Sequence, residues 1–267
     1  MHAFRSLALG LALLTGTAIA AAPDPEVLDR GSDIAYRRAL QPAANDRRLN
    51  ADAMATSRAR RIANRLVLSA GAIDPQSKRY AWAVNLVPGA APDAQVYPGG
   101  RVIVTEALVG KAGLGDDEVG AILAHAFAHS LLGHETRRVA TIVAERDASA
   151  DPNRRALDVA DATTEVIRTL RYTPEEIESA DRLSVEMLAR AAYDPRAAGS
   201  AWRRLALGDK GMVARSPASE SRLGTLDATI RAAVPLYDET RAKSEAAARQ
   251  ERPPRISGPT KAGPAVR

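Results

Sequence analysis

Hydrophobic positions spaced three and four residues apart dominate this chain and predict a mostly helical protein. The clearest early example runs from Asn45 to Leu68, where Ile62, Leu66 and Val67 stand among many arginines. This pattern is typical of an amphipathic helix that packs along one face. A second apolar stripe leads through Phe127 and predicts a buried helix. Further helices are predicted over 135–164 with a break at 151–153, from a cap at Thr173 to about 192, over 197–207 and over 219–233.

Two short segments have the composition of strands instead. Tyr80 to Val87 is rich in strand-forming residues, and Val102 to Thr105 is a β-branched run that follows the turn Pro98-Gly99-Gly100. The two segments are separated by a further turn around Pro88 to Pro92. We expect a small sheet, with antiparallel pairing as its natural arrangement.

Both ends of the chain differ from its middle. The first twenty residues combine Arg5, an apolar run from Leu7 to Leu14 and the small residues Ala18-Ile19-Ala20, which is typical of a cleaved secretory signal peptide. A first membrane helix is the weaker alternative, because the run is shorter than the roughly 20 residues that a bilayer needs. We therefore expect a periplasmic or secreted protein. From Arg241 onward large apolar residues are scarce, so a disordered basic tail is expected.

Composition narrows the classes of site and partner. The chain has no cysteine, which excludes disulfides and thiolate zinc sites. Its formal charge of +5 would suit nucleic acid, but no basic and aromatic motif accompanies it, and an exported chain meets anionic envelope surfaces instead. A solvated basic surface is the simplest interpretation of the charge.

The buried helix carries the candidate chemistry. His125 and His129 are four residues apart, the spacing at which two imidazoles on one helix face can share a zinc ion. In the HExxH motif of zinc peptidases, a glutamate follows the first histidine and serves as general base for the metal-bound water. Here that residue is Ala126. The metal-binding pair is present and the base is not.

Two longer stretches carry a family resemblance. The first is Asp93-Ala94-Gln95-Val96-Tyr97-Pro98-Gly99-Gly100, followed by a strand that ends in Thr105. The second is Asp116-Asp117-Glu118-Val119, which leads into the histidine helix. With them the chain resembles, from about residue 38 to 236, the zinc metallopeptidase family that includes HtpX, BepA and the CAAX prenyl proteases, especially its exported bacterial members.

The resemblance implies a site from which several functional residues are missing. The family's third zinc ligand is a glutamate four residues before an aspartate that orients the first histidine. The aspartate is Asp181, but the ligand position holds Ile177. A histidine and an arginine of the family approach the substrate's developing oxyanion. The arginine is kept as Arg222, whereas Ser216 replaces the histidine.

Alternatives stay open for the missing groups. Asp181 or a water molecule could complete a zinc site. Glu176, Glu178 or Glu135 could serve as a rearranged base. His134 could complete a metzincin-like triad, but that pattern needs a histidine ten residues after the first ligand, and His134 is nine residues after it. We therefore interpret His134 as a structural or surface residue.

The expected fold is α+β: a mostly helical, zincin-like metallopeptidase domain with a small β-sheet beside the metal-binding helix. We expect a signal peptide over 1–20, a lead-in over 21–37, the domain over 38–238 and a basic tail over 239–267. The losses favour a catalytically impaired pseudo-peptidase that holds zinc weakly or not at all. It would bind unfolded or envelope protein segments in quality control, with an active zinc endopeptidase as the alternative. The tail could contact an anionic membrane surface, and no nucleic-acid partner is expected.

Overall fold

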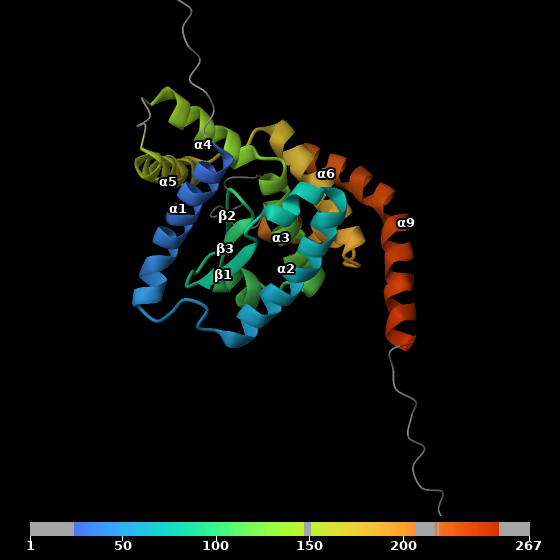
Figure 1. The fold of residues 1–267 in the computed structure, drawn as a ribbon. Coiled ribbons are helices and arrows are strands. Elements are labelled where there is room, and N and C mark those ends of the chain that lie inside the picture. The colour runs from blue at the N-terminus through green and yellow to red at the C-terminus, as the bar shows by residue number, and fades with distance from the viewer. Residues whose placement is uncertain (1–23, 147–150, 207–216, 218, 251–267) are drawn as a thin grey trace, which may run out of the picture.

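A small three-stranded sheet lies beside the histidine helix in the computed structural model, which describes residues 24–146, 151–206, 217 and 219–250 (Figure 1). In chain order the elements are α1 (Pro25–Asn45), α2 (Ala53–Ile73), the 3-10 helix η1 (Pro75–Arg79), β1 (Ala83–Val87), β2 (Ala94–Tyr97), β3 (Arg101–Thr105), the π-helical turn η2 (Ala107–Lys111), α3 (Asp116–Leu131), α4 (His134–Glu145), α5 (Pro152–Thr169), α6 (Pro174–Arg190), α7 (Ala197–Leu205) and α9 (Glu220–Gln250). The α+β prediction, mostly helical with a small sheet, is confirmed.

The sheet has the order β1-β3-β2 and is mixed, so the expectation of antiparallel pairing was wrong for one of its two pairs. β2 and β3 are antiparallel and joined by the Pro98 turn, whereas β1 and β3 run parallel. The segment after β1 carries the chain to the far side of the sheet, and β3 then enters between its neighbours. Successive side chains of β3 point to opposite faces of the sheet, and both faces are buried, which explains the uninterrupted apolar run of this strand. Val102 and Val104 belong to the core formed with α2 and α3, and Ile103 belongs to the cluster with α1, so both faces are covered.

The Pro98-Gly99-Gly100 turn ties the sheet to the histidine helix. Gly99 and Gly100 both have φ of +83°, a conformation that favours glycine. A Cβ on Gly100 would lie 2.5 Å from the ring of Trp82, so only glycine allows this approach. The Gly100 amide donates to the Ser130 hydroxyl of α3 at 2.9 Å. The glycine motif thereby fixes the sheet beside α3.

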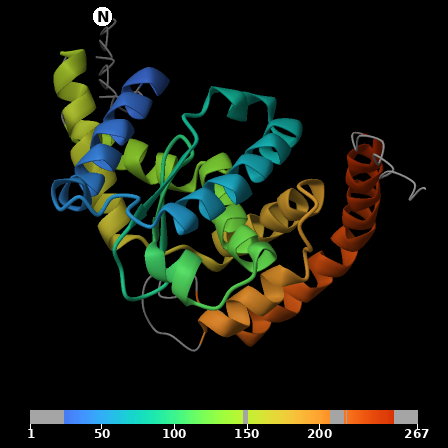
Figure 2. The same ribbon diagram turned by 90° about the horizontal axis from the view of Figure 1, so that it is seen from below.

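The predicted lead-in over 21–37 is part of the folded body where the structure describes it. α1 begins at Pro25 and packs against α5, which lies beside it in both views (Figures 1 and 2). A Cβ on Gly31 would lie 2.4 Å from the Val159 side chain, which shows how closely the two helices approach. Small residues such as Gly31, Ser32 and Ala35 are buried on α1, so the sequence shows no large apolar stripe there. The predicted domain boundary at residue 38 therefore cuts through a helix.

The last helix is longer than predicted. α9 continues to Gln250, past the predicted helix end at 233 and into the predicted tail, and its distal half stands at the edge of the molecule in Figure 2. Its residues 241–249 are exposed, so burial does not explain the extension. Alanines and ion pairs one helical turn apart, such as Lys243 with Glu239 at 2.6 Å and Arg241 with Glu245 at 2.9 Å, favour the helix without a core.

Several predictions concern residues outside the described part of the chain. The signal peptide, Ser216 and the last seventeen residues all lie there. Of the helices that are described, none is both long and apolar enough to cross a bilayer.

Candidate active site

The helix α3 brings the two histidines together in the core. An acidic first turn and a bond from the Gly115 amide to Glu118 Oε2, 2.9 Å long, fix its start. His125 and His129 are 2% and 1% exposed, and their Nε2 atoms lie 3.0 Å apart. Ala126 is buried among apolar neighbours of the main core. The pair therefore lies inside the protein. The position directly after His125 holds Ala126 and so supplies no acidic group.

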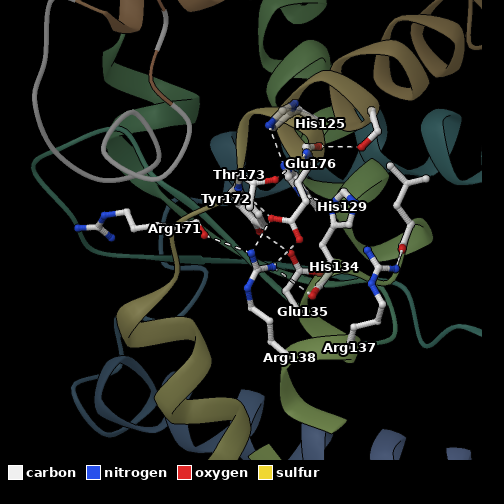
Figure 3. Close-up of polar contacts among 12 residues, drawn as sticks. His125, His129, His134, Glu135, Arg137, Arg138, Arg171, Tyr172, Thr173 and Glu176 are labelled. Atoms are coloured by element: carbon white, nitrogen blue, oxygen red, sulfur yellow. Dashed lines mark hydrogen bonds and ion pairs between the residues drawn. The ribbon is translucent and has the colours of Figure 1, made fainter. Parts of the chain in front are cut away.

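A third histidine extends the pair into a chain of three (Figure 3). His134 is the first residue of α4, and Gly133 before it has φ of +66°, which allows the short turn between α3 and α4. The turn folds His134 back so that its Nδ1 lies 2.7 Å from Nδ1 of His129. His134 is buried, which excludes the interpretation of a surface histidine. It meets the side of the His129 ring opposite to His125, so the three rings do not converge on one point.

Asp181 of α6 lies next to His125, at one end of the row of three histidines. Its Oδ1 is 2.9 Å from His125 Nδ1, and its two oxygens accept from Arg222 of α9 at 2.7 and 2.8 Å. The Arg222 guanidinium also lies 3.8 Å from the centre of the Trp202 ring. Burial acts to raise the Asp181 pKa, but the bonds from Arg222 and His125 outweigh it and hold that pKa at about 2. Asp181 is thus an ionised carboxylate whose two oxygens are engaged.

The three histidines are neutral. Burial lowers the pKa of His125, lowers that of His129 well below its usual range, and lowers that of His134 to about 4. A consistent assignment of protons follows from the ionised Asp181. His125 carries its proton on Nδ1, beside the Asp181 carboxylate, while His129 Nε2–H donates to His125 and His134 Nδ1–H donates to His129. The two contacts between the rings are then hydrogen bonds, His125 Nδ1 lies 2.9 Å from the Asp181 carboxylate, and no cation is needed to hold the rings together.

Tyr172 covers one face of the His129 ring. Its ring stacks on His129, with centroids 3.6 Å apart and planes 22° from parallel. The Tyr172 hydroxyl donates to Glu135 Oε1. Glu135 is fully buried, and its Oε2 has no hydrogen-bond partner among the described residues. Burial raises its pKa to about 7. Glu135 is therefore a carboxyl group close to half protonation at neutral pH, held against a tyrosine.

The glutamates considered as a rearranged base have other partners. Glu176 accepts from Arg138 at 2.8 and 2.5 Å and also caps α6 by accepting from the Thr173 amide. Glu178 is exposed and lies 3.5 Å from Arg182. Ile177, between them, is buried and presents only carbon to the third-ligand position. Glu176 is therefore engaged by Arg138 and the α6 cap, and Glu178 lies on the surface beside Arg182.

The donor set of the described residues does not fit a catalytic zinc centre. Such a centre uses three protein ligands at about 2.0–2.2 Å and one water. The Nε2 separation of His125 and His129 is close to the value of about 3.3 Å that tetrahedral zinc would impose. A third donor is missing, because Ile177 has none and Asp181 is bound to Arg222. Among the residues the structure describes, no group of three histidine, aspartate or glutamate side chains is placed to hold a metal.

A cleft of about 350 Å³ lies beside this cluster, between α6 and the first half of α9. Its wall is mostly apolar and hydroxylic, with Asp181 and Arg222 at its base. The described residues that line it are Tyr172, Pro174, Ile177, Glu178, Asp181, Pro217, Ser219, Ser221, Arg222, Thr225, Leu226 and Thr229. None of the three histidines is among them. Among the described residues, the cleft therefore meets the cluster through Tyr172, Ile177 and the Asp181–Arg222 pair.

Sequence reasoning missed three residues that shape this site. Tyr172, Trp202 and Arg138 contact respectively the ring of His129, the guanidinium of Arg222 and the carboxylate of Glu176. Tyr172 stands two residues before the Pro174 that opens α6, and a position next to a helix cap gave no sign of a stacking role. Arg138, four residues after His134, is one of many arginines in the sequence.

Comparison with known proteins adds the evolutionary relation. The sequence model described as Peptidase family M48 matches residues 54–230, which is more than half of the chain. One relative is the mitochondrial metalloendopeptidase OMA1 of Schizosaccharomyces pombe, which is 27% identical over 155 residues. That alignment covers 54% of this chain and 42% of the yeast protein, so this chain spans less than half the length of that relative.

Proposed function

The chain belongs to peptidase family M48, and from that premise we propose that it binds polypeptide segments in the α6–α9 cleft without cleaving them. The observation that carries the proposal is the enclosure of the histidine pair. Tyr172 stacks on His129, Asp181 is held by Arg222, and neither histidine lines the cleft. A polypeptide in the cleft would meet an apolar and hydroxylic wall. A metal-bound water would have no place beside it.

The size of the catalytic loss supports a binding role. A positioned general base contributes about 10²- to 10⁴-fold to a rate, and Ala126 supplies none. A lost oxyanion donor at Ser216 would cost roughly another 10²- to 10³-fold. Ile177 further removes an anionic ligand from the metal. Because these losses act on one reaction, hydrolysis by the family's mechanism would be too slow to serve the cell.

We further propose that the protein acts after export, in the quality control of envelope proteins. The support is the signal-like sequence of its first twenty residues together with the family relation to a metalloendopeptidase. Contact of the basic C-terminal residues with anionic membrane lipids belongs to the same proposal.

The second candidate is an active zinc endopeptidase. The observation that favours it is the Nε2 separation of 3.0 Å, close to that of a zinc-bound pair. It would require Tyr172 and Asp181 to leave their present partners, so that the pair opens to the cleft and gains a third ligand.

Labelled casein, an unfolded protein, tests the two candidates. We expect it to bind the purified chain and to stay intact with and without added zinc. Thr225→Trp should block binding, because Thr225 is an exposed residue of the cleft wall. Ala228→Trp is the matched control, since Ala228 is exposed on α9 and does not line the cleft. Chelator-sensitive cleavage would establish the second candidate instead, and an absence of binding would refute the first.

A further inference from the structure

A second depression, of about 540 Å³, lies next to the cleft and is rich in arginine. It is formed by α4, the end of α5 and the segment that leads into α6. Arg137, Arg138 and Arg171 contribute its charge, and Glu176 is the one carboxylate among its described lining residues. The apolar side chains Ile142, Val166 and Leu170 also line it. The depression therefore combines an apolar surface with a net positive charge of two.

Two of the three arginines have no ion pair with a described carboxylate. Arg138 lies in the middle and is neutralised by Glu176, which accepts from both of its terminal nitrogens. Arg137 and Arg171 lie on either side of it in Figure 3. They donate to the backbone carbonyls of Leu132 and Leu170 at 2.6 and 2.7 Å, and neither has an ion pair with a described carboxylate.

A neighbouring arginine at the end of α4 shows the contrast. Arg146, the residue that follows α4, pairs with Glu165 at 2.6 Å, so this part of the surface does use acidic partners. The backbone bonds of Arg137 and Arg171 position their guanidinium groups and leave further N–H donors on each. Such donors in a fixed planar group suit a carboxylate.

The depression and the cleft share one wall. The non-helical segment between α5 and α6 contributes Arg171 to the depression, and Tyr172 and Pro174 to the cleft. Arg171 and Pro174 are three residues apart, so their Cα atoms lie at most about 11 Å from each other. An extended polypeptide would cross that distance with about three residues. One ligand can therefore occupy the cleft and reach the arginines.

We infer that the depression receives a carboxylate of the polypeptide that lies in the cleft. The preferred ligand is then a segment with an apolar residue about three positions from a glutamate, an aspartate or its own C-terminal carboxylate. This inference rests on the proposed function and gives the binding chemistry of its ligand. The positive charge of the depression favours a carboxylate as the bound group. Because the depression shares a wall with the cleft, a polypeptide in the cleft is favoured over a membrane phosphate as its source.

Two matched peptides test the inference. Both are rhodamine-labelled decapeptide amides of glycine, serine, valine and leucine. One carries a single glutamate three residues after its last leucine, and the other carries glutamine there. By fluorescence anisotropy, we expect the glutamate peptide to bind about threefold to tenfold more tightly, as one or two exposed ion pairs provide. The preference should shrink as salt is raised.

Substitutions locate the effect. Arg137→Gln together with Arg171→Gln should remove the preference and leave the glutamine peptide's affinity unchanged. Arg168→Gln is the matched control, because Arg168 is an exposed arginine of α5 that lines neither the depression nor the cleft. It should preserve the preference.

The outcomes separate this inference from the proposed function. Equal binding of the two peptides would overturn the carboxylate preference and leave the cleft proposal intact. Binding of neither peptide, with casein also unbound, would refute the proposed function itself. Vesicles of phosphatidylglycerol and of phosphatidylcholine form the last arm. Capture by the anionic vesicles alone, lost in the double variant and combined with equal peptide binding, would assign the arginines to membrane phosphate and overturn the inference.

Discussion

Two buried carboxyl groups lie at opposite ends of the histidine cluster and differ in charge. Asp181 is ionised, with bonds from Arg222 and His125, and its pKa is about 2. Glu135 accepts a hydrogen bond from Tyr172 and has no cation bound to it among the described residues, and its pKa is about 7. A buried carboxylate stays charged only where a cation and hydrogen bonds replace its water. The Asp181 end therefore depends on a charge pair, and the Glu135 end is stabilised where Glu135 holds its proton, below about pH 7.

The largest expected effect comes from removing the cation at the Asp181 end. Arg222→Met would leave the Asp181 carboxylate buried without its cation, with the His125 ring beside it. We expect a loss of about 3–5 kcal/mol in the free energy of unfolding, measured by urea denaturation. Arg203→Met is the control, because its pair with Asp227 is exposed and should be worth no more than about 1 kcal/mol. Equal losses in the two variants would show that the Asp181–Arg222 pair contributes no more to the free energy of unfolding than an exposed pair does.

The Glu135 end should respond to rising pH. Its folded pKa of about 7 lies above the ordinary 4.5, so the folded state holds the proton more tightly than the unfolded state does. Its contribution to stability is complete below pH 4.5 and is lost as pH rises through 7. Between pH 5 and 8 the loss is about 2–3 kcal/mol. Urea denaturation at both values should show this loss in the wild type and in Glu178→Gln, and lack it in Glu135→Gln. A Glu135→Gln variant with the wild-type pH dependence would contradict the assignment.

The Asp181 end should respond in the opposite direction. Its folded pKa of about 2 lies below the ordinary 3.8, so its contribution is complete above pH 3.8 and is lost as pH falls through 2. The loss should be about 2 kcal/mol. Denaturation measured from pH 4 to pH 2 should show this dependence in the wild type and in Asp227→Asn, whose aspartate is exposed, and a smaller one in Asp181→Asn. The same slope in all three proteins would remove the contrast between the two ends.

The smallest expected effect is on catalysis. Ala126→Glu restores the glutamate of the HExxH motif, but Ile177 still offers no third ligand and Tyr172 still covers His129. We expect casein to remain intact with this variant in the presence of zinc. Robust, chelator-sensitive cleavage by the single variant would show that the site is one residue from activity.

The sequence predicted the parts of this protein that depend on local pattern. The apolar stripe of α3, the Thr173 cap with Pro174 and the glycine turn at Gly99 and Gly100 all give the expected elements, because each is determined by neighbouring residues. The parallel pairing of β1 could not be predicted, since it depends on which strand enters between the others. The exposed end of α9 was missed because helix propensity, and not burial, supports it.

The candidate site divides in the same way. Motif register placed Ile177, Asp181 and Arg222 on the helices that surround the histidines. It could not show that Arg222 binds Asp181 with two bonds or that Tyr172 covers His129. The first contact joins α6 to α9, and the second joins the segment before α6 to α3. The roles assigned to Ala126 and Ser216 stay predictions, and Ser216 lies outside the described residues.

The central claim is that the three histidines form a neutral, hydrogen-bonded part of the core. Long-range ¹H–¹⁵N NMR of ¹⁵N-histidine-labelled protein tests it most directly, because imidazole nitrogen shifts distinguish protonated, unprotonated and metal-bound atoms. We expect three neutral rings at pH 6, with the proton on Nδ1 of His125 and on Nε2 of His129, and no change when one equivalent of zinc is added. A shift of both Nε2 signals to metal-bound values would contradict the account.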